Sequence, residues 1–207
     1  MPKGIRPTQD KVRKALFDIL GDIEGLFFLE LFAGSGAVGL EAASRKAKKV
    51  ILVESNRDCQ IAITKNITGL KADNCILYPQ EVGVAVARLD QKKERFNLIF
   101  LDPPYTKSPD SHLCDKIDKA NLKLADRGYS VSLALRLHSG STSAGEGDSL
   151  SKKTLQMLAA YDILAPDGFI IIQHFKKDNL PESLGELILE KRKRYGDTHL
   201  SFYRKIV

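Results

Sequence analysis

The chain divides into short apolar runs separated by polar segments, and the spacing of apolar residues changes from run to run. Apolar positions with helical spacing follow Pro7 and predict a helix over Thr8–Leu20. Continuous apolar runs are typical of strands buried on both faces of a sheet. Four such strands are predicted before residue 105, at Leu26–Phe32, Lys49–Glu54, Asn74–Tyr78 and Phe96–Leu101. Helices are predicted between them, at Leu40–Lys46, at Asp58–Gly69 where a glycine closes the helix, and at Gly83–Leu89.

Strand and helix alternate four times, which predicts a parallel sheet with right-handed crossovers. A further helix at Leu155–Leu164 and a strand at Gly168–His174 follow a break in the pattern. Two last strands, Leu187–Arg194 and His199–Lys205, flank the Gly196-Asp197 turn and predict a closing antiparallel hairpin. The expected fold class is therefore α/β and Rossmann-like, in one domain spanning residues 1–207.

The break covers Ser108–Lys153, and its Ser139–Ser149 stretch is rich in glycine and serine. We expect a flexible insertion at about residues 126–153. Within it, Tyr129–Leu137 alternates apolar and polar residues and is compatible with either a strand or part of a helix.

Composition narrows the function classes only modestly. The formal net charge is +6, which favours a polyanionic partner such as RNA but equally describes a solvated basic surface. Three scattered cysteines and four scattered histidines lack metal-ligand spacing, so no metal site is expected, and the cysteines favour a reducing compartment. No apolar run reaches membrane-spanning length. A cytoplasmic monomer without membrane contact is the simplest interpretation.

A glycine turn follows the first predicted strand. Gly34 to Gly39 reads Gly-Ser-Gly-Ala-Val-Gly, and Glu54 ends the next strand about 20 residues on, as in nucleotide-binding βαβ units. Glycines let the backbone approach a ligand closely, and a carboxylate at the second strand can accept both ribose hydroxyls. Residues around the turn are therefore predicted to bind the nucleotide: Phe32, Gly34, Ser35, Gly36 and Glu54.

Glu30 bears on which nucleotide is bound. It lies four residues before Gly34, where an acid would repel a pyrophosphate but suits the cationic sulfonium and amine of S-adenosylmethionine. This favours S-adenosylmethionine over NAD. Glu81, after the third strand, is a candidate adenine contact or an exposed loop glutamate.

Asp102-Pro103-Pro104-Tyr105 follows the fourth strand, at the edge where ligands bind in such sheets. An exocyclic base amine is a poor nucleophile, and it needs acceptors for its N–H bonds as positive charge builds on nitrogen. Asp102 and the Pro103 carbonyl would supply them, and Tyr105 offers a face on which a flipped base can stack. The alternative is an ordinary Pro-Pro strand end.

These motifs resemble one known family. GIRPTQDKVRKALFDIL, LELFAGSGAVGLEAASR, VILVESN, LIFLDPPY and KRYGDTHLSFYRK are similar to the bacterial RsmD-type enzymes, which are 16S ribosomal RNA guanine-966 N2-methyltransferases. The resemblance implies a class I methyltransferase sheet of seven strands with an antiparallel last strand and helices on both faces. It also implies that Glu30, Gly34, Gly36, Glu54 and Glu81 line the cofactor site and that Asp102 and Tyr105 hold the guanine.

The resemblance implies, further, that Arg6 and Thr8 of the Arg-Pro-Thr segment lie near the mouth of the active site and contact RNA, together with Tyr105. The expected partner is ribosomal RNA or the 30S particle. Family members usually carry a basic hairpin before this segment, and this sequence begins almost at the segment, so a lower RNA affinity is expected. Two other hypotheses stay open at this stage: an NAD-dependent oxidoreductase, and a non-catalytic RNA-binding or ribosome-assembly protein.

Overall fold

A computed structural model describes residues 10–104 and 149–206 of the chain. The predictions for Arg6, Thr8, Tyr105 and most of the insertion at 126–153 fall outside these residues. In chain order the elements are α1 (Asp10–Leu20), β1 (Phe27–Leu31), α2 (Ala37–Ser44), β2 (Lys49–Val53), α3 (Arg57–Leu70), β3 (Cys75–Tyr78), α4 (Val82–Gln91), β4 (Phe96–Leu101), α7 (Leu150–Ala160), β5 (Leu164–Phe175), β6 (Ser183–Leu184), β7 (Leu187–Tyr195) and β8 (Thr198–Lys205).

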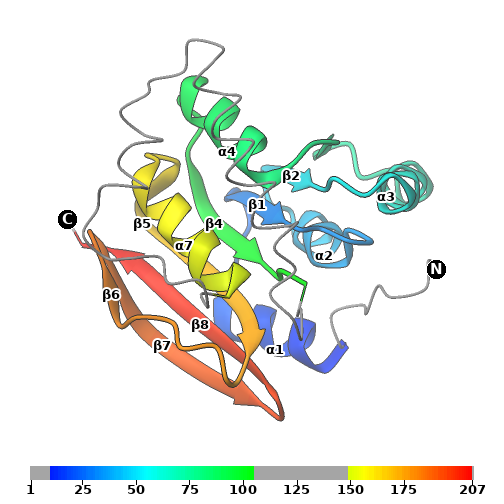
Figure 1. Cartoon of the computed structure of the whole chain (residues 1–207). Helices are drawn as coiled ribbons and strands as arrows, with labels where there is room; N and C mark the ends of the chain where they lie inside the picture. The colour runs from blue at the N-terminus through cyan, green and yellow to red at the C-terminus, as the bar shows by residue number, and fades with distance from the viewer. Residues whose placement is uncertain (1–9, 105–148, 207) are drawn as a thin grey trace.

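The described strands form one sheet in the order β3-β2-β1-β4-β5-β8-β7-β6. Strands β1 to β5 pair in parallel, whereas β8 is antiparallel to β5 and β7 is antiparallel to β8. The parallel order starts at β1 and runs outward in both directions, which places a topological switch point between β1 and β4. Figure 1 shows the resulting twisted sheet with its helices.

Helices cover both faces of the sheet, and each face has its own hydrophobic core. On one face, α4 and α7 pack against alternate strand residues such as Leu29, Ile99 and Ile172. On the other face, α1, α2 and α3 pack against the residues in between, such as Phe28 and Phe100. Because neighbouring strand residues point to opposite faces and both faces are covered, the central strands β1, β2 and β4 are apolar along most of their length, as the sequence predicted.

The prediction of an α/β, mostly parallel sheet with an antiparallel last strand is confirmed. Among the described residues the sheet has eight strands rather than seven, because the two-residue strand β6 pairs with the start of β7. The closing hairpin at Gly196-Asp197 is present as expected.

Several predicted boundaries differ from the observed ones. Strand β5 begins at Leu164, inside the predicted helix Leu155–Leu164, rather than at Gly168. Helix α2 begins at Ala37, inside the glycine turn, rather than at Leu40. Helix α7 begins at Leu150, because the Ser149 hydroxyl accepts a hydrogen bond from the Lys152 N–H and caps the helix. Helix α3 passes Gly69 and ends after Leu70, where Lys71 adopts a left-handed conformation with φ 52°. The prediction that a glycine closes this helix was wrong.

No helix among the described residues is long and apolar enough to cross a membrane.

Candidate functional site

The carboxyl ends of β1, β2 and β4 meet at one edge of the sheet. Leu31 is paired with Val53 on one side and with Leu101 on the other, so the residues that follow these three strands lie side by side. Glu54 and Asp102 are among them, and Glu30 lies one residue inside the same edge. Open α/β sheets bind ligands at this edge, beside the switch point. The topology therefore brings three predicted site carboxyls together.

The turn between β1 and α2 is built from unusual backbone conformations. Phe32, Gly34 and Gly36 all have positive φ, at 59°, 55° and 75°. Positive φ is ordinary for glycine but costs energy for phenylalanine, and such strain gathers at functional sites. Asn66 of α3 donates a hydrogen bond from its side-chain amide to the Ser35 carbonyl oxygen at 3.2 Å, which ties the turn to the neighbouring helix.

Glu30 is buried beneath this turn, with 3 % of its surface exposed. Its Oε2 accepts a hydrogen bond from the Gly39 N–H at 2.8 Å. Gly36, the N-cap of α2, has no side chain with which to cap the helix, so the Glu30 carboxyl takes the place of a capping side chain. Gly39 makes this contact possible, because a Cβ there would lie 2.2 Å from Leu52 Cδ2 and 2.8 Å from Glu30 Oε2.

Burial dominates the ionisation of Glu30. Desolvation raises the pKa of its carboxyl from 4.5 to about 8, although the hydrogen bond from Gly39 opposes the shift. The nearby carboxyls of Asp102 and Glu54 raise this pKa further, by a smaller amount than burial does. A buried acid with two other carboxyls nearby is suited to a cationic ligand, which would favour its ionised form.

Glu54 holds the turn from the β2 side. Its Oε2 accepts a hydrogen bond from the Gly34 N–H at 2.7 Å, and its Oε1 accepts one from the Asn56 N–H at 2.7 Å. The N–H groups of Gly34 and Gly39 are therefore already bonded to carboxyls. A pyrophosphate bound at the start of α2, as in dinucleotide-binding proteins, would need such N–H groups and would meet negative charge instead. The arrangement disfavours NAD.

Asp102 comes directly after β4 and is partly buried, and Pro103 beside it is buried. The Asp102 Oδ2 accepts a hydrogen bond at 2.8 Å from the side-chain amide of Gln173, which lies on β5 and is 5 % exposed. The other end of that amide, Gln173 Oε1, is buried and has no hydrogen-bond partner among the described residues. A buried acceptor without a partner is costly, so this oxygen is suited to receive a donor from a ligand.

A second side-chain amide with a buried atom lies two residues after β3. Gln80 precedes Glu81, and its Nε2 is buried without a partner among the described residues. Glu81 is the N-cap of α4 but its side chain makes no capping hydrogen bond, so its carboxyl is not committed to the helix. Sequence reasoning selected Glu81 and missed Gln80 and Gln173. The available signal was a polar side chain at the carboxyl end of an otherwise apolar strand.

His174, next to Gln173, points to the opposite face of β5 and belongs to the core. Its Nε2 shares a hydrogen bond of 2.8 Å with the Ser201 hydroxyl, which also accepts one from Arg192 Nε at 3.0 Å. Desolvation lowers the pKa of His174 to about 4, so the ring is neutral at physiological pH. This histidine therefore has a structural role in the core.

With this geometry in view, comparison with known proteins decides the family. The sequence profile of the family described as "Conserved hypothetical protein 95" matches residues 1–129 and 146–204. The chain belongs to this family. The resemblance to RsmD-type proteins drawn from the motifs is thereby confirmed.

Relatives with descriptive names agree with this assignment. The chain is 28% identical to the candidate rRNA methyltransferase YlbH of Bacillus subtilis over 202 residues, which are 97% of this chain and 88% of that protein. It is 42% identical over 103 residues to ribosomal RNA small subunit methyltransferase D of Escherichia coli, and this match spans 49% of the chain and 50% of the relative.

Solved structures show the same fold. A candidate methyltransferase of Escherichia coli, YhhF, matches 99% of this chain and 90% of its own with a TM-score of 0.68 and 25% identity. The sheet described above is thus a class I methyltransferase sheet.

Proposed function

We propose that this protein transfers a methyl group from S-adenosylmethionine to the exocyclic N2 amine of a guanine in small-subunit ribosomal RNA. The observation that carries the proposal is the group of three carboxyls at one edge of the sheet. Glu30 and Glu54 are bonded to the glycine turn, and Asp102 is held beside them by Gln173. The names of the relatives indicate ribosomal RNA as the substrate class, and the resemblance of the motifs to RsmD-type enzymes indicates guanine.

The residues at this edge fit S-adenosylmethionine. The ligand carries a sulfonium and an ammonium group, and both complement the acids around Glu30. In this proposal Glu54, which follows β2, accepts hydrogen bonds from the ribose hydroxyls. Glu81 and Gln80, whose amide nitrogen has no partner among the described residues, contact the adenine. When bound, the cofactor supplies an electrophilic methyl group.

Asp102 and the Pro103 carbonyl act on the substrate amine. As the N–C bond forms, positive charge builds on nitrogen, and acceptors placed beforehand stabilise it without reorganising. Gln173 fixes one Asp102 oxygen, so the carboxylate has a single orientation towards the site. The proton released by the methylated amine can pass to Asp102 or to water. We propose that Tyr105, together with Arg6 and Thr8, holds the flipped base and its flanking RNA.

This proposal sets the partner and the place of action. The partner is small-subunit ribosomal RNA, alone or in the 30S particle, the protein acts as a monomer, and the cytoplasm is where such RNA is made. A non-catalytic assembly protein would have no use for a carboxylate oriented by a buried glutamine, so the structure favours an enzyme.

The test replaces Asp102 by alanine. We expect methyl transfer to 16S RNA to fall by roughly 100- to 1000-fold, because a preorganised acceptor for the developing charge is lost. The affinity for S-adenosylmethionine should fall far less, because Glu30 and Glu54, which are hydrogen-bonded to the glycine turn, are unaltered in this protein. Transfer is measured with radiolabelled cofactor on 16S RNA and on 30S particles, and affinity by calorimetry.

Asp73→Asn is the matched control, because Asp73 is an exposed acid in the loop between α3 and β3. It should leave both measurements unchanged. Near-normal turnover by the Asp102→Ala protein would contradict the role of Asp102. Absence of transfer by the unaltered protein on both RNA substrates, with cofactor bound, would contradict the proposed function itself.

A further inference from the structure

The hairpin of β7 and β8 has an excess of basic over acidic residues. Residues Leu187–Lys205 include six lysines and arginines but only two acids, while the formal net charge of the whole chain is +6. Both acids are already paired, Glu190 with Arg204 at 2.9 Å and Asp197 with Lys176 at 2.7 Å. The run Lys191 to Arg194 at the centre of β7 is therefore not neutralised by its own hairpin.

The four residues of this run differ in what they contact. Arg192 donates hydrogen bonds to the Ser201 hydroxyl and the Leu180 carbonyl, and Arg194 donates one to the Gly196 carbonyl. Lys191 and Lys193 are exposed and form no ion pair with any residue that the structure describes. These two lysines are available to an external anion.

The sheet places Lys193 in line with the candidate site. Asp102 is bonded to Gln173 on β5, Gln173 is paired with Leu200 on β8, and Leu200 is paired with Lys193 on β7. Directly paired residues point to the same face of a sheet, so Lys193 lies on the face of Asp102 and Gln173. In Figure 1, the arrowheads of β4, β5 and β7 lie towards the same edge of the sheet.

The separation suits a nucleic-acid strand. Three steps between adjacent strands, at about 4.8 Å each, put the backbone of Lys193 about 14 Å from that of Asp102. This span corresponds to about four nucleotides at roughly 3.4 Å along one strand of a duplex. Lys191, two residues away on the same face, extends the charged line along β7. A phosphate backbone leading away from a base at Asp102 can thus reach both lysines.

We propose that the face of β7 that carries Lys191 and Lys193 binds the RNA backbone on one side of the target guanine. This inference rests on the proposed function, because it assumes that the substrate is ribosomal RNA. It adds a contact region distant in sequence from the amino-terminal Arg-Pro-Thr segment. Phosphate contacts of this kind hold the register of the strand without reading its bases.

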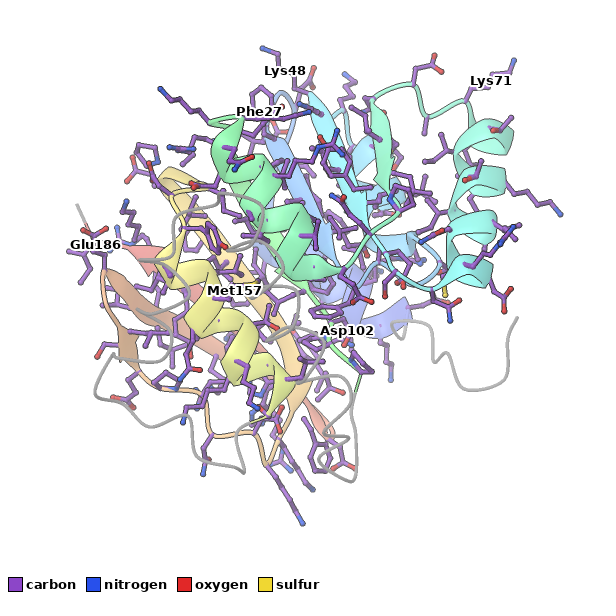
Figure 2. The ribbon with its side chains drawn as sticks, turned by 45° about the horizontal axis from the view of Figure 1, so that its top comes forward. Phe27, Lys48, Lys71, Asp102, Met157 and Glu186 are labelled. Carbon is purple, nitrogen blue, oxygen red and sulfur yellow. The ribbon has the colours of Figure 1, made fainter. Side chains whose placement is uncertain are left out.

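The experiment compares Lys193→Ala with Lys48→Ala. Lys48 is an exposed lysine at the amino end of β2, on the opposite edge of the sheet from Asp102, as Figure 2 shows. Binding of a 16S RNA fragment that contains the methylated guanine is measured at several salt concentrations. For Lys193→Ala we expect the slope of log affinity against log salt to fall by about 0.7 to 0.9, the value for one lost phosphate contact.

At low salt the Lys193→Ala protein should bind RNA several-fold more weakly and show a raised KM for RNA. Its kcat at saturating RNA and its affinity for S-adenosylmethionine should be unchanged, and Lys193→Arg should restore binding. Lys48→Ala should behave as the unaltered protein. The RNA-binding affinity and its salt dependence are measured without methyl transfer, so this test does not depend on the transfer assay.

Equal effects of the two alanine substitutions on RNA binding would overturn the proposal, since they would mark Lys193 as an ordinary solvated lysine. So would a Lys193→Ala protein that loses affinity only for anionic phosphatidylserine vesicles and keeps its RNA affinity. If the unaltered protein binds the RNA but transfers no methyl group, the proposed function fails while the binding surface is still judged by the salt slope.

Discussion

Glu30 is the residue at which burial, helix capping and ligand charge meet. Its carboxyl replaces the missing N-cap side chain of α2, and burial makes its ionised form unfavourable. A cation bound nearby would reverse this preference. Without a ligand, the protonated Glu30 side chain therefore stabilises the start of α2 through its hydrogen bond. When a cation binds, the ionised side chain can pair with it.

The raised pKa of Glu30 predicts a stability change with pH. Between its ordinary value of 4.5 and about 8, the unfolded chain releases this proton while the native protein retains it. Stability therefore falls as pH rises through this window. Glu30→Gln keeps an oxygen that can accept from the Gly39 N–H but does not titrate. We expect its free energy of unfolding, relative to the unaltered protein, to rise by on the order of a few kcal/mol between pH 5 and 8.5.

Urea unfolding at the two pH values measures this difference. Asp73→Asn is again the control, because Asp73 is exposed, whereas an acid such as Glu94 forms an ion pair with Lys49. The same Glu30→Gln protein should bind S-adenosylmethionine more weakly, because the cation loses its partner. A stability difference that does not vary with pH would contradict the buried neutral carboxyl.

Single residues were predictable where a motif fixed their spacing. Glu30, Glu54 and Asp102 follow from the glycine turn and from the Asp-Pro-Pro-Tyr motif, and each lies at the edge of the sheet where it was expected. Gln173 was not predicted, because its role depends on the pairing of β4 with β5, whose sequences are about 70 residues apart. The positive φ of Phe32 was not predicted either, since nothing in an aromatic residue indicates a left-handed turn.

At the scale of single elements, the end of α3 shows where propensity and structure disagree. Gly69 suggested a helix end, yet the chain continues to Leu70 and turns at Lys71, whose N–H donates to the Ile67 and Thr68 carbonyls. These hydrogen bonds satisfy carbonyls of the last helical turn. In most helix ends of this kind a glycine occupies the left-handed position and its N–H makes such bonds. Helix ends depend on a few such hydrogen bonds, which explains why interiors were predicted better than boundaries.

Replacing Lys71 by glycine should therefore stabilise the protein by about 1 kcal/mol, because glycine adopts the left-handed conformation without steric cost. Lys65→Gly is the matched control, since Lys65 is exposed in the interior of the same helix. That substitution should destabilise by about 1 kcal/mol. Chemical unfolding of both variants measures the two values, and changes of the same sign would contradict the assigned helix end.

At the scale of the whole molecule, β4 divides the sheet by function. The strands β1 to β3 carry the turn and acids of the proposed cofactor site, and β5, β8 and β7 carry the row from Gln173 to Lys193. Alternation of strands and helices was sufficient to predict the parallel half. The relation between Lys193 and Asp102 was not predictable, because it needs the register of three strand pairings, two of which, β4 with β5 and β5 with β8, join strands that are distant in sequence. A shift of one residue would turn Lys193 to the opposite face.

The assignment of the β1 to β3 half of the sheet to the cofactor site predicts how ligands change the stability of the protein. A ligand that binds only the folded state at about 100 times its Kd adds roughly 2.7 kcal/mol. In a protein of this size each kcal/mol raises Tm by about 2–4 °C, so S-adenosylmethionine should raise Tm by roughly 5–10 °C. NAD at the same concentration should produce no shift, because the carboxyls of Glu30 and Glu54 already hold the N–H groups that its pyrophosphate would need. Differential scanning fluorimetry measures both, and a shift with NAD as large as that with S-adenosylmethionine would refute the assignment of this edge to a cationic cofactor.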